Sequence, residues 1–299
     1  MDLNNFMEIV RDNMQTIVGD KANVEIKEVG KNNGKVYHGL MVSEPGVNCS
    51  PSMYLDEMFE QYKRGRSIED IMEQLNLIYR ESRCNRNIDV SFYTDYEKVC
   101  VKILPKLINY SRNKEMLAKL PHRVIEDLAV VYYCEVKDEN IGNGLIMVKN
   151  EHMEAWGVDE ERLYNDSFKN AGRLNPVKLN TLADTVSEMT GIEQEELPED
   201  LNMLVLTNKN NLFGATTLLY DDVLQNIADR LDSDLYILPS SIHETIILSS
   251  GNDYDPDQIM QLKYMVEQVN AENVAQEDYL SDNVYYYNRN KGRLCMALS

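Results

Sequence analysis

The sequence lacks the features that identify membrane, secreted and nucleotide-binding proteins. It contains no run of about 20 apolar residues, which is the length that a helix needs to cross a membrane. Its start, residues 1–6, has neither the basic region nor the apolar core of a secretory signal. Glycine-rich phosphate loops of the forms GxGxxG and GxxxxGKS/T are absent as well. We therefore predict a cytoplasmic protein without membrane association.

Residues that commonly bind metals are scarce and scattered. None of the histidines has a second histidine three or four positions away, and they stand at His38, His122, His152 and His243. The five cysteines form no CxxC pair and stand at Cys49, Cys84, Cys100, Cys134 and Cys295. This spacing predicts no zinc site, no other metal and no cofactor. In the cytosol the thiols are expected to stay reduced.

Basic residues are outnumbered: 30 lysines and arginines face 50 aspartates and glutamates, which gives a formal charge of −20. The field of such a chain repels nucleic-acid phosphates and anionic lipid surfaces. We predict no direct nucleic-acid binding and a surface whose acidity serves solubility. An alternative is an acidic mimic of nucleic acid, although the acids alternate with basic residues and the densest acidic run, 193–200, is short.

The composition is that of a globular protein, with 43% hydrophobic and 27% charged residues. A length of 299 residues exceeds that of an ordinary single core, because domains commonly have about 150 residues. We predict two α+β domains, 1–140 and 141–299. Each is expected to be a small, mainly antiparallel sheet packed with helices on one side.

Apolar spacing, turn residues and helix caps predict the elements of the first part of the chain. Helices are expected at 3–18, at 51–64, at 67–79 with Ser67 as the cap, and at 96–109. Pro105 should kink or break the last of these helices. Strands are expected as a hairpin at 24–42 with its turn at 31–34, and as a second pair at 128–136 and 145–148.

The same signals predict the elements of the second part. Helices are expected at 159–172, at 182–189, at 223–231 with Asp221 as the cap, and after Asp255, which precedes a proline. Strands are expected in antiparallel pairs at 203–207 with 214–220, at 235–238 with 245–248, and at 284–287 with 293–296.

Four stretches carry a resemblance to a known family. They are NCSPSMYL at 48–55, LPHRVIEDL at 120–128, LTNKNNLFGA at 206–215 and DLYILPSSIHE at 234–244. The chain resembles an uncharacterised domain-of-unknown-function family abundant in gut Clostridia, and it is more distantly similar to the YtpQ-like proteins of bacilli. The similarity to the YtpQ-like proteins is confined to about residues 147–287, which makes the first half a candidate separate module. The resemblance implies a bacterial, cytoplasmic setting and no known reaction, cofactor or partner.

One short stretch contains the residue types of an acyl-transfer site, namely Ser241, His243 and Glu244. A working triad needs a base that is oriented by a third group and an oxyanion hole near the nucleophile. Neither is visible in the sequence, and the GxSxG elbow is absent. We therefore favour a tight turn in which the hydroxyls bind backbone groups, and keep an uncharacterised hydrolase as the alternative.

Tyrosine is unusually frequent, with 18 tyrosines against five phenylalanines and one tryptophan. Tyrosine is favoured at protein interfaces because it combines apolar area with a polar tip. Tyr285, Tyr286 and Tyr287 should alternate across a terminal strand, which makes them the candidate binding residues. The leading hypothesis is a non-enzymatic binding or regulatory protein that engages a protein partner through an acidic, tyrosine-bearing surface.

Overall fold

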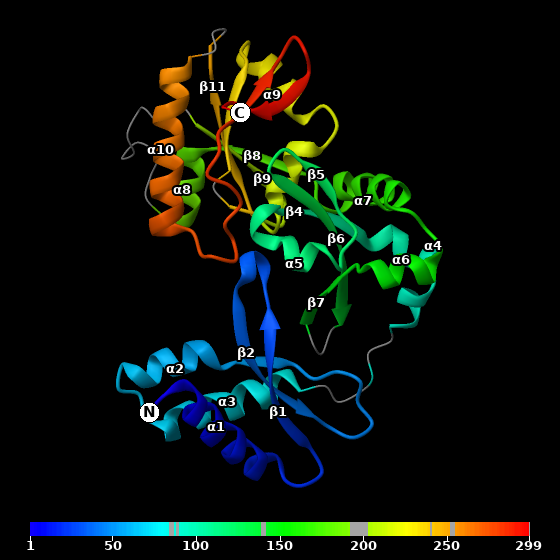
Figure 1. Ribbon diagram of the computed structural model, residues 1–299, viewed down its shortest axis with the longest axis vertical. Helices are drawn as coiled ribbons and strands as arrows, with labels where there is room; N and C mark the ends of the chain where they lie inside the picture. Colours follow the sequence, from blue (N-terminus) through cyan, green and yellow to red (C-terminus); the bar gives the residue numbers. More distant parts are fainter. Residues whose placement is uncertain are drawn as a thin grey trace. The chain divides into compact units, whose positions relative to one another are not determined.

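The computed structural model describes residues 1–83, 87, 90–138, 142–191, 203–239, 241–251 and 255–298. The acidic run predicted at 193–200 lies outside these residues. Within them, helices and three mainly antiparallel sheets confirm the α+β class (Figure 1). The chain forms two compact units, the first from Met1–Tyr93 and Val136–Leu145 and the second from Thr94–Glu135 and Ile146–Ser299. The predicted domain limits, 1–140 and 141–299, stay a prediction.

The first unit contains a three-stranded antiparallel sheet in the order β1-β2-β3. Its strands are β1 (Asn23–Gly30), β2 (Val36–Ser43) and β3 (Ser52–Tyr54). The predicted hairpin is confirmed, because Asn23 pairs with Ser43 and Gly30 with Val36. Its helices are α1 (Leu3–Val18), α2 (Leu55–Lys63) and α3 (Ile68–Ser82).

Apolar faces and side-chain caps explain these helices. The predicted cap is confirmed, since the Ser67 hydroxyl oxygen accepts from the backbone N–H of Asp70 at 3.1 Å. On α1, the apolar residues Phe6, Val10 and Met14 recur every four positions and are fully buried. They share one hydrophobic core with residues of the sheet and of α3.

The second unit contains a six-stranded antiparallel sheet in the order β13-β12-β10-β11-β9-β8. Its strands are β8 (Val177–Thr181), β9 (Leu204–Asn208), β10 (Leu235–Leu238), β11 (Thr245–Ser249), β12 (Tyr285–Asn288) and β13 (Arg293–Met296). Both predicted hairpins, β10 with β11 and β12 with β13, are confirmed.

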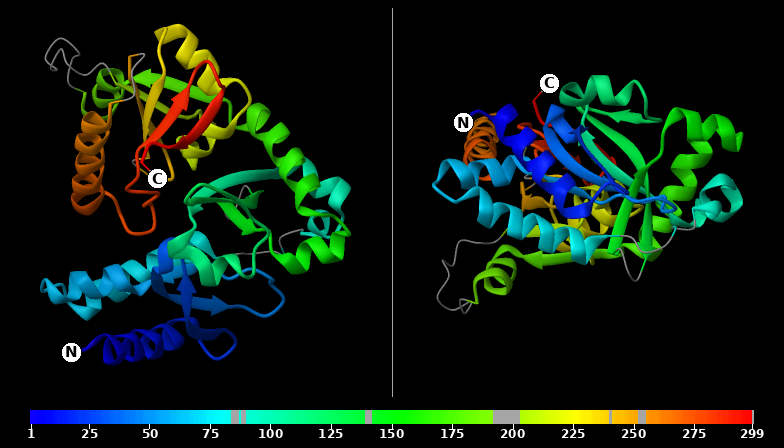
Figure 2. Two further views of the ribbon diagram at one scale, coloured as in Figure 1. Left: turned by 45° about the horizontal axis from the view of Figure 1, so that its top comes forward. Right: turned by 90° about the horizontal axis from the view of Figure 1, so that it is seen from below.

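Helix α10 (Pro256–Asn273) lies along one face of this sheet, as Figure 1 and the left view of Figure 2 show. Its inner residues Ile259, Leu262 and Val266 pack against the sheet. The predicted start is confirmed, because the Asp255 carboxylate accepts from the backbone N–H of Asp257 at 3.0 Å. Helix α8 (Leu182–Thr190) follows β8 directly.

A smaller sheet is built around β6 (Leu128–Asp138), which belongs to the second unit up to Glu135. The other strands are β4 (Ile103–Asn109), β5 (Arg123–Ile125) and β7 (Gly142–Met147), each paired with β6. The pairing expected between 128–136 and 145–148 is therefore confirmed. Neighbouring helices are α5 (Lys114–Leu117), α6 (Asn150–Trp156) and α7 (Glu160–Leu174).

The predicted helix over 96–109 is wrong. The segment forms a short helix, α4 (Tyr96–Val99), a 3-10 turn η3 (Cys100–Lys102) and then strand β4. Pro105 has no N–H to donate, and it is tolerated here because β4 pairs only with β6 in the described sheet. The strand is buried along most of its length, so its continuous apolar pattern resembles that of a buried helix.

The predicted strand over 214–220 is also wrong, because the segment is the buried 3-10 helix η6 (Gly214–Leu219). It follows Phe213, whose φ of 55° lies in the left-handed region and ends the extended path of the chain. Asp221 is not the cap of helix α9 (Val223–Leu231), since Asp222 takes that position without a side-chain bond. The Asp221 carboxylate is thus not used as a helix cap.

Disulfide bonding departs from the sequence prediction at one position. Cys49 is disulfide-bonded, so the expectation of reduced thiols is wrong for this residue, whereas Cys100, Cys134 and Cys295 are free. A disulfide depends on which cysteines come close in space, and spacing along the chain does not give that. None of the helices among the described residues has the length and apolar character needed to cross a membrane.

Candidate functional site

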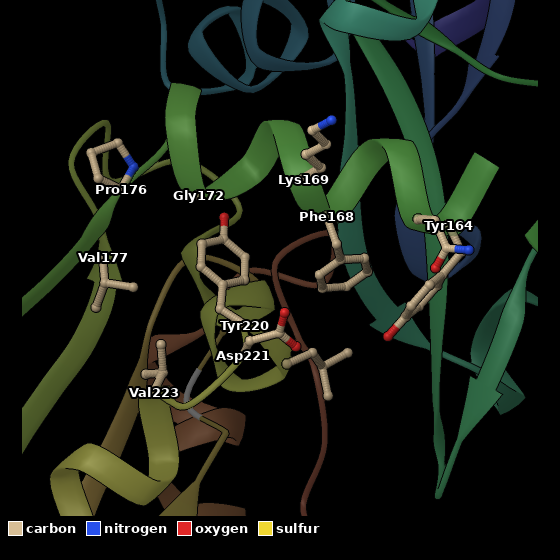
Figure 3. A pocket seen from close by; sticks show the side chains of 11 residues that line it. Tyr164, Phe168, Lys169, Gly172, Pro176, Val177, Tyr220, Asp221 and Val223 are labelled. Atoms are coloured by element: carbon tan, nitrogen blue, oxygen red, sulfur yellow. The ribbon is translucent and has the colours of Figure 1, made fainter. Parts of the chain in front are cut away.

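A cavity of about 510 Å³ opens in the second unit between α7, the start of β8 and the segment that joins η6 to α9 (Figure 3). This volume lies within the range of about 300–1,000 Å³ that is usual for small-ligand sites. Both polar and apolar groups line it, namely Tyr164, Asn165, Phe168, Lys169, Gly172, Pro176, Val177, Leu219, Tyr220, Asp221 and Val223.

Three aromatic rings form part of its wall. Tyr164 and Phe168 lie one turn apart on α7, so they share a face of the helix, and their ring centroids are 4.4 Å apart. The ring of Tyr220 meets Phe168 edge to face, with the centroids 6.1 Å apart. All three side chains are half-buried. We call the group formed by Tyr164, Phe168, Tyr220 and Asp221 the aromatic pocket.

The ring of Tyr164 is held in place by a charged neighbour and its hydrogen-bond partners. The guanidinium carbon of Arg123 lies 4.0 Å from the ring centroid of Tyr164. Arg123 also donates to Glu160 Oε2 at 2.7 Å, and the hydroxyl of Tyr132 donates to the other oxygen of Glu160. Glu160 is the first residue of α7, where the helix dipole favours a carboxylate. The ring of Tyr164 therefore already accepts one cation of this chain.

The aromatic pocket contains one carboxylate, that of Asp221, and Lys169 lines the same cavity. Burial raises the pKa of Tyr220 to about 12, so its phenol is neutral near pH 7. Burial is also the main cause of the raised pKa of Tyr164, which Arg123 lowers and the nearby Asp221 carboxylate raises further. In Figure 3 the Asp221 carboxylate lies between Tyr220 and Phe168, whereas Lys169 extends away from it. Electron-rich ring faces around a carboxylate suit a cation.

The predicted residues Ser241, His243 and Glu244 lie together in the turn between β10 and β11. The Ser241 hydroxyl donates to Glu244 Oε1 at 2.9 Å and accepts from the backbone N–H of His243 at 3.0 Å. The ring of His243 has other partners. Its Nδ1 accepts from the backbone N–H of Phe213 at 3.3 Å, which leaves Nε2 to donate to Asp278 Oδ1 at 3.2 Å.

The contacts of His243 do not place it as a general base for Ser241. A general base must contact the proton that it removes, and among the described contacts both ring nitrogens of His243 are engaged with groups other than Ser241. The hydroxyl of Ser241 binds within the turn in the manner of a Ser/Thr turn motif. The hydrolase stays a hypothesis, and among the described residues no contact aligns the ring of His243 with the hydroxyl oxygen of Ser241.

The three tyrosines of β12 alternate across the strand. Tyr285 and Tyr287 are buried, and Tyr286 is half-buried. Their hydroxyls all bind within the second unit, to Asp127, Asp234 and Gln225 in the order Tyr285, Tyr286 and Tyr287. A binding role for these tyrosines stays a prediction. Each would have to act through its ring, since its hydroxyl serves the fold.

The chain matches one described family. The match to the family of unknown function DUF5688 covers residues 3–289. The chain belongs to this family. No curated protein and no solved structure matches it. The family match does not test the predicted similarity to proteins of gut Clostridia and to YtpQ-like proteins, which stays a prediction.

Two stretches that carry the family resemblance, 206–215 and 234–244, meet in the second unit. The Thr207 hydroxyl donates to the carbonyl oxygen of His243 at 2.8 Å. The rings of Phe213 and His243 stack with their centroids 5.7 Å apart. The resemblance in these stretches therefore coincides with a packed loop contact. In the described part of the chain, no group of three or more His, Cys, Asp or Glu side chains is placed to hold a metal.

Sequence reasoning missed the aromatic pocket. The sequence pattern places Tyr164 and Phe168 only in the helix expected at 159–172, and Tyr220 only in the strand expected at 214–220. One available signal was an aromatic pair at i and i+4 on a helix that is otherwise strongly polar. The position of Tyr220 and Asp221 beside that pair depends on η6, which the local pattern does not predict.

Proposed function

We propose that the protein acts by binding, and that the aromatic pocket receives a cationic group such as an alkylammonium or a guanidinium. The observation that carries this proposal is that three half-buried rings and one carboxylate line the same cavity of about 510 Å³. The formal charge of −20 supports it, because a negative field attracts cationic partners and accelerates their encounter.

The expected affinity of the aromatic pocket alone is modest. A cation contributes about 1 kcal/mol against each accessible ring and about 1 kcal/mol beside a surface carboxylate. Because Arg123 already contacts the ring of Tyr164, two rings and one carboxylate give about 3 kcal/mol, which corresponds to a dissociation constant of about 6 mM. Tight binding thus requires further contacts, as a protein partner would provide. A protein partner is also what the sequence hypothesis proposes, although that hypothesis names Tyr285, Tyr286 and Tyr287 as the binding residues.

The biological setting belongs to the same proposal. The resemblance to proteins of gut Clostridia and to YtpQ-like proteins supports a bacterial, cytoplasmic binding or regulatory protein. The two alternatives from the sequence are a hydrolase at Ser241 and an acidic mimic of nucleic acid. Among the described residues no observation favours either of them over cation binding.

Calorimetric titration with choline tests the proposal. The control ligand is the uncharged analogue of choline in which carbon replaces the nitrogen. Choline should bind with a dissociation constant of about 6 mM, and the analogue should bind much more weakly. Replacing the carboxylate by Asp221→Asn should weaken choline binding about fivefold, and Phe168→Leu should weaken it further by removing a ring.

The matched control is Asp222→Asn, which removes the same charge from the neighbouring residue. Asp222 does not line the cavity, and asparagine tolerates its φ of 60°. Equal weakening by both substitutions would show a general effect of net charge. Equal binding of choline and its uncharged analogue would contradict cation recognition.

A further inference from the structure

Strand β8 forms one end of the six-stranded sheet. It pairs with β9 on one side, and no other strand in the described part of the chain pairs with its outer side. An edge strand offers backbone N–H and C=O groups that can pair with another extended chain. The outer side of β8 is therefore a surface that can pair with another extended backbone.

The register shows which backbone groups of β8 face outward. The N–H of Lys209 donates to the carbonyl of Pro176 at 2.9 Å, and that of Leu182 donates to the carbonyl of Met203 at 2.8 Å. Antiparallel pairing alternates along a strand, so the even-numbered residues between these two bonds face β9. The backbone groups of Val177 and Leu179 consequently point away from the sheet.

The N–H of Thr181 ends this outward series. It donates to the Asp184 carboxylate at 3.1 Å, as part of the capping box at the start of α8. The side chains of Lys178 and Asn180 both bind Glu188 on α8. Helix α8 thus contacts Lys178, Asn180 and Thr181, and these contacts leave out the outward groups of Val177 and Leu179.

The aromatic pocket lies at the start of this edge. Pro176 and Val177 line the cavity together with Tyr220 and Asp221, and Figure 3 shows Val177 on the strand beside them. Val177 is 39% exposed. An extended segment that pairs with Val177 and Leu179 therefore passes the mouth of the cavity, where one of its side chains can enter.

We infer that the edge of β8 binds an extended basic segment of a partner protein as an added strand, with an arginine or lysine side chain in the aromatic pocket. This inference rests on the proposed function. The outward N–H and C=O groups select an extended backbone, and the Asp221 carboxylate with the net charge of −20 selects a basic segment over an acidic one. Backbone pairing supplies the additional contacts that the aromatic pocket alone lacks.

The test compares two probes on the full chain by calorimetry. One is N-acetyl-arginine methylamide, and the other is a blocked peptide with a central arginine flanked by valines and threonines. Strand addition predicts that the peptide binds at least about tenfold tighter than the small amide, because several backbone hydrogen bonds are added. Two further peptides carry N-methyl groups on one or the other set of alternate amides. Methylation of only one set should remove this gain, because only alternate amides of an added strand face β8.

The outcomes separate the inference from the proposed function. Equal binding of the peptide and the small amide, or equal loss on methylating either set, overturns strand addition and leaves cation binding by the aromatic pocket intact. If neither probe binds, both proposals fail. A dimer in sedimentation experiments that the peptide does not dissociate, together with an absence of peptide binding, would assign the edge to a second copy of the chain and also overturn the inference.

Discussion

The substitution Gly214→Ala tests the packing that brings Asp221 and Tyr220 to the cavity. Gly214 begins η6, and an added Cβ would lie 2.1 Å from Thr207 Oγ1, 2.4 Å from the carbonyl oxygen of His243 and 2.8 Å from the backbone nitrogen of Asn208. Two of these three atoms belong to the backbone of β9 and of the β10–β11 turn. Neither can move without disturbing the sheet.

The expected cost of Gly214→Ala is large for a single methyl group. Overpacking of a filled core costs about 1–3 kcal/mol and occasionally more, and contacts with backbone place this case at the upper end. A shift of Thr207 would also lose its hydrogen bond to the carbonyl of His243, which contributes about 1 kcal/mol. We therefore expect a loss of about 4 kcal/mol, which is a substantial part of the stability of about 5–15 kcal/mol that is typical of natural proteins.

Urea unfolding followed by the fluorescence of Trp156, the only tryptophan, reports on the second unit. The control is Gly172→Ala in α7, where nothing lies within 4 Å of an added Cβ and where alanine favours the helix. It should leave the free energy of unfolding unchanged or raise it slightly. Adding Thr207→Ala should rescue Gly214→Ala only in part, because the two backbone contacts remain. Equal midpoints for Gly214→Ala and Gly172→Ala would refute this reasoning.

Three further predictions concern the titration of Tyr220, the reactivity of Ser241 and the half-buried carboxylate of Asp127. Burial raises the pKa of Tyr220 from 10.0 to about 12. The stabilisation from its neutral phenol is therefore complete below pH 10 and is lost as the pH rises through about 12. Unfolding midpoints measured against pH should fall in this window, and a constant midpoint there would contradict the prediction. Ser241 should stay unlabelled by a fluorophosphonate probe in the folded protein, because its hydroxyl binds within the turn, and labelling would support the hydrolase instead. Tyr285→Phe should lower the free energy of unfolding by about 2 kcal/mol, because it removes a hydrogen-bond donor from the carboxylate of Asp127. Tyr287→Phe loses a hydrogen bond to the neutral amide of Gln225, so it should lower the free energy of unfolding by about half as much.

Local patterns predicted most elements of the fold. Helix caps such as Ser67 and Asp255 are set within four residues, so the sequence alone identifies them. The β12–β13 hairpin is also local, because its strands flank a short turn that contains Gly292. These predictions required no knowledge of distant contacts.

Long-range contacts explain the elements and the site that the sequence did not predict. Segment 103–109 is a strand because it pairs with β6, and η6 depends on the contacts of Gly214 with Thr207 and His243. The aromatic pocket joins α7 to a segment that begins at Tyr220, about 50 residues later in the chain. Because no local pattern specifies this meeting, sequence reasoning favoured the consecutive tyrosines of β12 instead.

The most direct measurement is an NMR titration of the protein with choline after selective labelling of the tyrosine rings. Binding in the aromatic pocket predicts that the ring signals of Tyr164 and Tyr220 shift in a saturable way, while those of Tyr285 and Tyr287 stay unchanged. The uncharged analogue should leave all four unchanged. Saturable shifts confined to the tyrosines of β12, or no shift at Tyr164 and Tyr220, would contradict the central claim that the aromatic pocket binds a cation.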